Sequence, residues 1–395
     1  MAEFFPIIFA VVVMAIVSVI AGIFLKKLNP GWWELRWVRL VAYLIPIFGG
    51  ICALLWAIGV QLNSGILHGI GASGAALTVV VQFAMLLSLP IAAVAQMLLK
   101  RIGRKLIGER VLNTRRRVIL KTAAAVFPVA AISGGIAGVV GSTGPVKLPK
   151  IKLKFPNLPE ALDGFKILQI SDIHLGYYVL LRDLEKTLTN AADLKPDLVL
   201  ITGDIADDLT ALPYALEMIT KLNPPYGIYA CLGNHEYYRG IAEVIKDFNN
   251  SPVPLLVNRG MTINIGEDAR IYVAGADDPR YLSRLHPGFI KKTVTESLAD
   301  APPDSFRILM SHRPQAYDYA ADLGVELTLS GHTHGGQIGF AHKSAFEELL
   351  AYKYLWGHYI KENGSQLYTT SGMGHWFPFR LGCPQEAPLL VLQRG

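Results

Sequence analysis

Cysteine is scarce in this chain. Its 395 residues include only Cys52, Cys231 and Cys383, and Cys52 lies in an apolar segment, so the sequence predicts no disulfide framework. Acidic residues are scarce in the first 150 residues, which contain three, and none lies well inside an apolar stretch. A transporter is expected to carry such a residue as a coupling site, so anchoring is the simpler role for this region. The chain also lacks internal repeats and low-complexity tracts.

Long apolar segments are abundant at the N-terminal end. The chain is 52% hydrophobic, high for a soluble enzyme of this length, and the excess lies in four segments, at 4–25, 40–60, 74–99 and 118–141. Each is near or above the ~20 residues that a membrane-spanning helix needs. We therefore predict a transmembrane region of about four helices over residues 1–141.

The connectors between these segments differ in charge. The first connector carries four basic residues against one acidic residue, the second (61–73) carries no charged residue, and the third (100–117) carries eight basic residues against one acidic residue. Because basic connectors stay in the cytoplasm, this alternation predicts a multi-pass membrane protein with everything after Gly141 outside the cytoplasm. The stretch 114–121 resembles a twin-arginine export signal. A basic flank that orients the last helix would predict the same side.

The net charge of residues 151–395 argues against nucleic acid as a partner. The whole chain has a formal net charge of +6, but residues 151–395 contain 22 Lys and Arg against 28 Asp and Glu. The basic excess therefore belongs to the apolar region. An acidic soluble part predicts no nucleic-acid binding.

Beyond the apolar region the sequence reads as one α/β domain. Residues 142–165 form a polar tether and a first strand, in which Ile151, Leu153 and Phe155 alternate with lysines. Over residues 166–395, helix-like stretches such as 182–193 and 212–222 alternate with short apolar strands. The predicted strands are 166–170, 198–201, 227–232, 271–274, 306–310, 326–329, 367–370 and 389–392.

Polar side chains follow five of these strands where each one ends. In α/β sheets the carboxyl ends of the strands face the binding crevice, so these side chains can converge. Carboxylates, imidazoles and an amide oxygen without thiolates suit divalent Mn, Fe or Zn. Seven candidate ligands exceed one tetrahedral site but fit two sites that share a carboxylate. The run GHTHGG at 331–336 then lets each of its histidines reach a different metal.

The five strand ends carry the motifs D-x-H at 172–174, G-D-x-x-D at 203–207, G-N-H-E at 233–236, His312, and G-H-x-H at 331–334. In order and spacing, these resemble the five motifs of the calcineurin-like metallophosphoesterases over about residues 150–395. The run GGQ at 335–337 and the tail from Ser371 to Pro384 look like the membrane-attached bacterial branch often labelled YkuE-like phosphodiesterases. This likeness implies a multi-pass protein of the bacterial inner membrane. The tripeptide His375-Trp376-Phe377 has no counterpart that we recognise in that branch.

The resemblance implies a fold of two mixed β-sheets packed face to face and flanked by helices. It also implies two divalent ions, Mn, Zn or Fe, with Asp204 bridging them and Asp207 orienting a ligand. His235 would protonate the leaving oxygen or stabilise the transition state. The implied ligands of the first metal are Asp172, His174 and His334, and those of the second are Asn234, His312 and His332.

The function implied is a membrane-anchored phosphoesterase in which a metal-bridging hydroxide attacks a phosphate ester. The expected substrate is a phosphate ester that is lipid-linked or part of the cell envelope. Arg380 and His375 are predicted to contact its phosphate.

Two alternatives remain open. One is a diphosphate hydrolase of a nucleotide-activated acylated sugar, as in lipid A synthesis; that work is cytoplasmic, and the basic connectors argue against it. The other is a protein that binds metal or phosphate without catalysis. The complete set of motif residues, including His235, argues against this second alternative.

Overall fold

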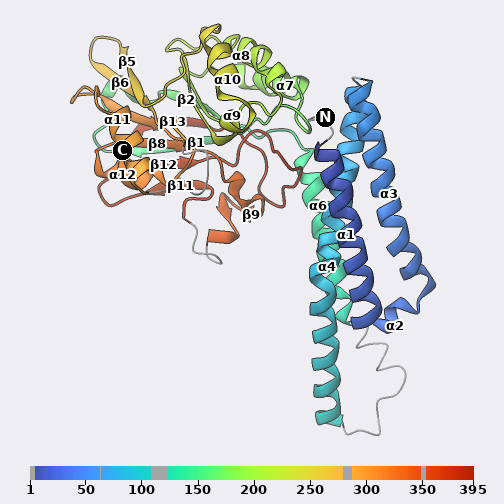
Figure 1. Ribbon diagram of the computed structural model, residues 1–395. Helices are drawn as coiled ribbons and strands as arrows, with labels where there is room; N and C mark the ends of the chain where they lie inside the picture. The colour runs from blue at the N-terminus through green and yellow to red at the C-terminus, as the bar shows by residue number, and fades with distance from the viewer. Residues whose placement is uncertain (1–4, 63, 108–122, 279–286, 348–352) are drawn as a thin grey trace. The chain divides into compact units, whose positions relative to one another are not determined.

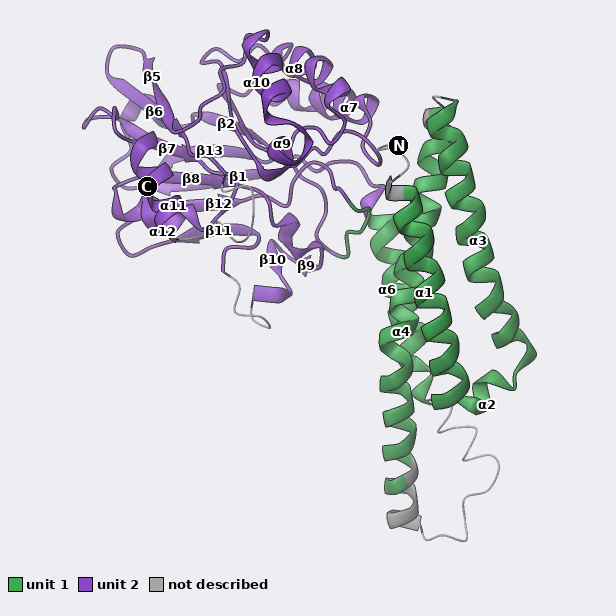
Figure 2. Cartoon of the chain, viewed as in Figure 1, with its two compact units in different colours: residues 1–141, 377–381 green, residues 142–376, 382–395 purple. Residues whose placement is uncertain are grey.

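The computed structural model describes residues 5–62, 64–107, 123–278, 287–347 and 353–395 (Figure 1). The chain forms two compact units (Figure 2). The first unit contains residues 1–141 and 377–381, and the second contains residues 142–376 and 382–395. A short segment near the C-terminus, residues 377–381, therefore belongs to the first unit.

Apart from the four-residue α2, the described helices of the first unit are long and apolar. They are α1 (Phe5–Leu28), α2 (Pro30–Trp33), α3 (Arg36–Gln61), α4 (Gly65–Ile107) and α6 (Val126–Ser142). Three stretches are long and apolar enough to cross a membrane, namely Ile7–Leu28, Arg36–Gln61 and Ile66–Leu99, whereas α6 has 17 residues.

Helix α4 begins earlier in the chain than the sequence predicts. We expected a connector at 61–73, but α4 begins at Gly65 because this uncharged, apolar stretch continues the helical pattern. Three predicted features lie outside the described residues: most of the third connector, the twin-arginine-like stretch 114–121, and residues 118–122 of the fourth segment. The count of four membrane-spanning helices therefore stays a prediction.

Side chains of the first unit are arranged with polar groups between helices and apolar groups outside. The amide Nε2 of Gln82 donates to Ser18 Oγ at 2.7 Å, and that of Gln96 donates to Asn29 Oδ1 at 3.1 Å. Large apolar side chains such as Leu87 are exposed, at 67%. Within this unit the tail segment 377–381 meets α6, where the Arg380 backbone N–H donates to the Gly138 carbonyl at 2.7 Å.

The second unit contains two mixed β-sheets. The five-stranded sheet has the order β1 (Lys150–Phe155), β13 (Leu389–Arg394), β2 (Lys166–Ile170), β3 (Leu198–Thr202), β4 (Ile228–Cys231). The six-stranded sheet has the order β11 (Gly357–Ile360), β12 (Gln366–Thr369), β8 (Leu327–Ser330), β7 (Phe306–Met310), β6 (Ala269–Gly275), β5 (Arg259–Ile265). A hairpin of β9 (Gly339–Phe340) and β10 (Lys343–Ser344) stands apart from both.

The register of these sheets brings several strand ends to one edge. Strands β2, β3 and β4 are parallel, with β13 antiparallel to β2. Strands β6, β7, β8 and β12 are also parallel, and β5 and β11 run antiparallel at the two edges. The carboxyl ends of β2, β3, β4, β7 and β8 are the strand ends that carry the sequence motifs.

Alternating side chains build the core between the sheets and outside them. Leu198 and Leu200 of β3 pack between the sheets with Ile308 and Leu327 of the facing sheet. Val199 and Ile201 of β3 point the other way, where α7 (Leu181–Ala192), α8 (Leu212–Thr220) and α10 (Ile241–Asn249) cover the five-stranded sheet. Helices α11 (Pro287–Ser297) and α12 (Ala316–Asp322) cover the six-stranded sheet. The predicted fold class, two packed mixed sheets flanked by helices, is confirmed.

Candidate metal centre

The predicted ligands lie just after strand ends, and most of them have a left-handed backbone conformation. Asp172 and His174 follow β2, Asp204 follows β3, Asn234 begins α9 (Asn234–Arg239) after β4, His312 follows β7, and His332 and His334 follow β8. Left-handed backbone is uncommon outside glycine and collects at functional sites, where surrounding structure holds it in place. Five ligands have positive φ: Asp172 (50°), His174 (51°), Asp204 (54°), His332 (68°) and His334 (49°).

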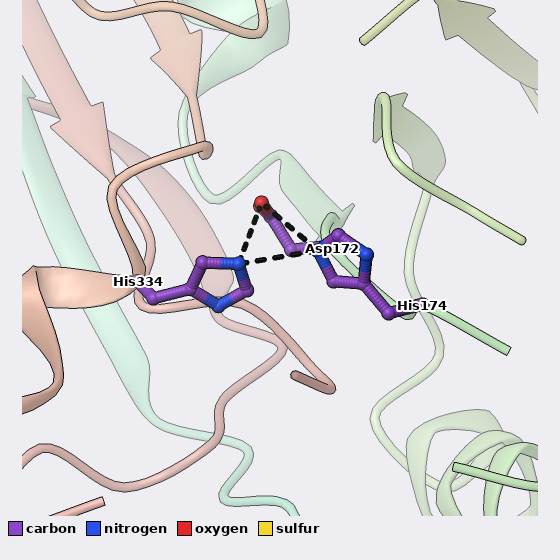
Figure 3. A group of neighbouring side chains, drawn as sticks. All are labelled: Asp172, His174 and His334. Carbon is purple, nitrogen blue, oxygen red and sulfur yellow. Dashed lines mark hydrogen bonds and ion pairs between the residues drawn. The ribbon is translucent and has the colours of Figure 1, made fainter. Parts of the chain in front are cut away.

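Asp172, His174 and His334 form one buried group (Figure 3). The Nε2 atoms of the two histidines lie 3.1 Å apart. Asp172 Oδ1 lies 3.9 Å from His174 Nε2 and 3.5 Å from His334 Nε2. Three ligand atoms that point at one another at these distances can surround one ion.

Asp204, His312 and His332 form a second group. His312 Nδ1 lies 2.7 Å from the Thr202 carbonyl oxygen, to which it donates, so Nε2 is left to face Asp204 Oδ2 at 3.1 Å. His332 Nδ1 lies 3.2 Å from the same Nε2 atom. These three ligand atoms also converge on one point.

Asn234 provides a test of whether a metal fits here. Its side chain is buried, and its Oδ1 atom has no hydrogen-bond partner among the described residues. A buried amide oxygen without a partner is unfavourable unless an ion or another donor takes it up. The residues therefore fit the two divalent ions that the sequence motifs imply.

Asp204 stands between the two groups. Its Oδ1 accepts the backbone N–H of His235 at 2.9 Å. Its Oδ2 lies 3.1 Å from His312 Nε2 in the second group and 3.7 Å from His174 Nε2 in the first. A single oxygen is therefore available to both groups.

The charges in the centre shift the pKa values of its ligands in different directions. Burial would raise the pKa of Asp204, but His312, His235 and His174 hold it well below its usual range. Burial would lower the pKa of His312, but the charge and hydrogen bond of Asp204 raise it to about 10. Burial, together with the positive charges of His312 and Arg313, keeps the pKa of His332 well below its usual range. His332 is thus neutral, whereas His312 has to give up a proton when an ion binds.

His235 lies beside the centre and is partly open to solvent. Its Nδ1 lies 2.5 Å from Asp207 Oδ1, and its Nε2 lies 4.0 Å from Asp204 Oδ2. Asp207 also contacts His174 Nδ1 at 3.4 Å and Arg239 Nε at 3.1 Å. Since His235, His174 and Asp204 also form a group that could hold an ion, the role of His235 has to be tested by metal content as well as rate.

Glycine is required where the motifs touch one another. A Cβ atom added at Gly331 would lie 2.1 Å from Asp172 Oδ2 and from Ser171 Oγ. Gly331 therefore lets the backbone of the fifth motif reach the carboxylate of the first, and the His332 N–H donates to Asp172 Oδ1 at 3.0 Å.

Two buried residues at the centre received no role from the sequence. The Glu236 carboxylate accepts backbone N–H groups of Gly233 at 2.7 Å, Asp204 at 2.9 Å and Ile205 at 2.8 Å, and so joins the second motif to the third. Its place at the third position of α9 after Gly233 is a capping pattern that could have indicated this role. The other residue is Arg313, whose partners come from distant parts of the sequence.

The two predicted phosphate contacts fall in different units. His375 is buried in the second unit, and its Nδ1 lies 3.1 Å from Gln385 Nε2. Arg380 is buried in the first unit. Both assignments stay predictions.

Comparison with known proteins extends these observations. The sequence profile described as calcineurin-like phosphoesterase matches residues 165–336, which include all five motifs. An uncharacterized metallophosphoesterase of Aquifex aeolicus is 32% identical over 196 residues, which are 49% of this chain and 72% of that protein. This chain belongs to the calcineurin-like phosphoesterase family.

Two further relatives resemble this calcineurin-like phosphoesterase. The uncharacterized metallophosphoesterase YkuE of Bacillus subtilis is 33% identical over 190 residues, 47% of this chain and 64% of that protein. A Danio rerio transmembrane protein with metallophosphoesterase domain is 29% identical over 270 residues, 66% of this chain and 60% of that protein. The chain spans less than two thirds of the length of both relatives. The predicted family is confirmed.

Proposed function

We propose that this protein is a membrane-anchored, two-metal phosphoesterase that hydrolyses a phosphate ester outside the cytoplasm of a bacterium. The observation that carries the proposal is the convergence of two ligand groups on the single oxygen Asp204 Oδ2, with the partnerless Asn234 Oδ1 beside them. A carboxylate oxygen within reach of both ligand groups suits a pair of neighbouring divalent ions. The donor set suits Mn, Zn or Fe.

The ions, when bound, would activate water for attack and offset negative charge on the phosphate. The residues that would hold them are Asp172, His174 and His334 for one ion and Asn234, His312 and His332 for the other, with Asp204 available to both. Burial of the ligands excludes bulk water from the centre, which strengthens its electrostatic effect.

His235 acts as the general acid. Its Nδ1 is engaged by Asp207, so Nε2 is the ring atom that faces the centre and can hold the proton for the leaving oxygen. Its side chain is 16% exposed, so that a substrate can reach it. Asp207 keeps the ring oriented, and Arg239 balances the charge of Asp207.

The helices of the first unit anchor the protein. Three stretches of sufficient length, exposed apolar side chains and polar contacts between the helices support placement in a bilayer. The basic first connector supports the orientation with the catalytic unit outside the cytoplasm. A lipid-linked or cell-envelope phosphate ester is the substrate class that suits such an enzyme.

The test is hydrolysis by the full-length protein purified in detergent. The protein is stripped with chelator and reloaded with Mn²⁺, Zn²⁺ or Mg²⁺, and rates are compared on bis(p-nitrophenyl) phosphate and p-nitrophenyl phosphate. We expect metal-restored turnover, and the ratio of the two rates assigns the preference for diesters or monoesters.

The matched control is His235→Ala. General acid catalysis is worth ~10²–10⁴-fold, so this variant should keep its metal content and lose most of its rate. A variant that loses an ion instead would make His235 a ligand. Two bound ions without turnover on either ester would favour a diphosphate hydrolase of narrow specificity or a non-catalytic binder.

A further inference from the structure

The chain passes the metal centre a last time after β12, in the buried turn 371–374. The Met373 backbone N–H donates to the Ser171 carbonyl at 2.9 Å, and the Gly374 backbone N–H donates to the Asp172 carbonyl at 2.8 Å. The turn therefore lies along the main chain of the first motif. That motif supplies two of the three residues in the group formed by Asp172, His174 and His334.

Gly372 is the residue of this turn that lies against the Asp172 side chain. A Cβ atom added at Gly372 would lie 2.7 Å from Asp172 Cβ and 3.3 Å from Asp172 Cγ. Two carbon atoms pack best at about 3.5–4.0 Å, so any side chain at Gly372 would displace the carboxylate. Gly372 also has a φ of 83°, which other residues rarely adopt. Glycine at this position thus lets the turn support Asp172 directly.

Two hydrogen-bond donors also hold the Asp172 carboxylate. The Ser171 hydroxyl donates to Oδ2 at 2.6 Å, and the His332 backbone N–H lies 3.0 Å from Oδ1 and 3.1 Å from Oδ2. Oδ1 is also the oxygen that faces the Nε2 atoms of His174 and His334. With these donors on its oxygens and the turn against its Cβ and Cγ atoms, the carboxylate is held in one orientation.

The turn is itself anchored by buried hydrogen bonds. The Thr370 hydroxyl oxygen accepts the Gly372 backbone N–H at 3.1 Å, and the Glu386 backbone N–H donates to the Gly372 carbonyl at 2.9 Å. The Glu386 side chain accepts the Ser371 N–H and the Thr370 hydroxyl, each at 3.2 Å. A turn held in this way can set the position of a side chain that packs against it.

We propose that the turn 371–374 positions Asp172 for the ion held by the first group, and that Gly372 is the residue through which it acts. The proposal rests on the two-metal function proposed above. Groups that orient a metal ligand typically contribute 10–100-fold to metal affinity. A side chain at Gly372 should therefore weaken the ion of the first group and spare the ion of the second. A turn that served only packing would affect both ions alike.

The experiment measures metal binding by the full-length protein in detergent. Gly372→Ala adds only the methyl group that meets Asp172. The matched control is Gly364→Ala, because Gly364 has a φ of 84° and nothing within 4 Å of an added Cβ atom. The two variants carry the same backbone strain, and only Gly372→Ala displaces the carboxylate. After chelator treatment and titration with Mn²⁺, we expect Gly372→Ala to bind one ion ~10–100-fold more weakly and Gly364→Ala to bind both as the wild type does.

Two further backgrounds show which ion is weakened. His312→Ala removes a ligand of the second group only, so Gly372→Ala should weaken the remaining ion by the full factor. His334→Ala removes a ligand of the first group only, and Gly372→Ala should then cause no further loss of affinity.

A milder variant carries the test if Gly372→Ala fails to fold by circular dichroism. Thr370→Val keeps the shape of the side chain but removes the hydroxyl that accepts the Gly372 N–H. It should weaken the same ion less strongly.

The outcomes distinguish this inference from the proposed function. Wild-type protein with two ions and Gly372→Ala protein with the same two affinities would overturn the role of the turn alone. An equal loss in Gly364→Ala, an equal loss in both backgrounds, or unchanged affinities in Thr370→Val used in its place would also overturn it. Wild-type protein that binds fewer than two ions would overturn the two-metal centre itself.

Discussion

At the scale of single residues, the two oxygens of Asp204 have separate roles. Oδ1 accepts a backbone N–H and fixes the carboxylate, which leaves Oδ2 for both ligand groups. An asparagine can keep the first contact through its carbonyl oxygen. It then presents an amide NH₂ where Oδ2 was, and an NH₂ group does not bind metal.

We therefore expect Asp204→Asn to lose both ions and the activity together. Metal content measured by mass spectrometry should fall from about two ions per chain to less than about one. Asp208→Asn is the matched control, because Asp208 is an exposed neighbour whose side chain accepts from the N–H and hydroxyl of Thr210. An Asp204→Asn protein that retains both ions would show that Asp204 does not bridge them.

The raised pKa of His312 makes metal binding depend on pH. Its pKa of about 10 in the metal-free chain exceeds its ordinary value of 6.5, so an ion must displace a proton across this window. We expect the apparent affinity for the second ion to rise about tenfold per pH unit between about pH 7 and 9. Titrations at several pH values check this, and affinity that does not change with pH would contradict it.

The raised pKa of His312 makes the stability of the metal-free chain change with pH in the opposite direction to its metal affinity. A raised pKa contributes stability that is fully present below pH 6.5 and is lost as pH rises toward about 10. Chelator-treated protein should therefore become less stable over the range in which the affinity for metal increases.

At the scale of elements, α3 and α4 come into backbone contact at Gly71. A Cβ atom added there would lie 2.2 Å from the Trp56 backbone nitrogen and 2.7 Å from the Cys52 carbonyl oxygen. Gly69, two residues earlier in α4, has nothing within 4 Å of the same position. Close approach at small residues is a common basis of helix packing in membranes.

Substitution by alanine should have opposite effects at these two glycines. Alanine favours a helix by about 1 kcal/mol over glycine, so Gly69→Ala should raise the midpoint of thermal unfolding or leave it unchanged. Gly71→Ala should lower it, because the added methyl group separates the helices. Thermal unfolding in detergent followed by circular dichroism measures both, and equal midpoints would contradict backbone contact at Gly71.

The elements of the second unit show what a sequence can predict. The apolar runs that became β2, β3 and β7 were predicted within one residue, because buried strands have a strong local pattern. Strand β5 (Arg259–Ile265), at a sheet edge, was missed although Met261, Ile263 and Ile265 alternate with polar residues. The motifs predicted which polar groups meet at the centre. They did not predict Asp278 beside Arg313, because no local pattern marks a contact between residues 35 apart.

At the scale of the whole molecule, the side of the membrane that holds the catalytic unit remains to be measured. Single cysteines at Ser64 and Thr114, in the second and third connectors, can be labelled in intact cells with a membrane-impermeant maleimide. The native cysteines are buried, so background labelling should be low. We expect labelling at Ser64 and none at Thr114, and permeabilised cells should label both. Labelling of Thr114 alone in intact cells would reverse the orientation.

The left-handed backbone at five ligand positions restricts which substitutions these positions can accept. Asp, Asn and His are enriched several-fold in this conformation, whereas other side chains occupy it rarely. Cysteine and glutamate, which would change the metal preference of a site, are therefore disfavoured by the main chain before any coordination chemistry applies. The five positions are Asp172, His174, Asp204, His332 and His334. The fold itself thus limits the range of metals that descendants of this sequence can acquire.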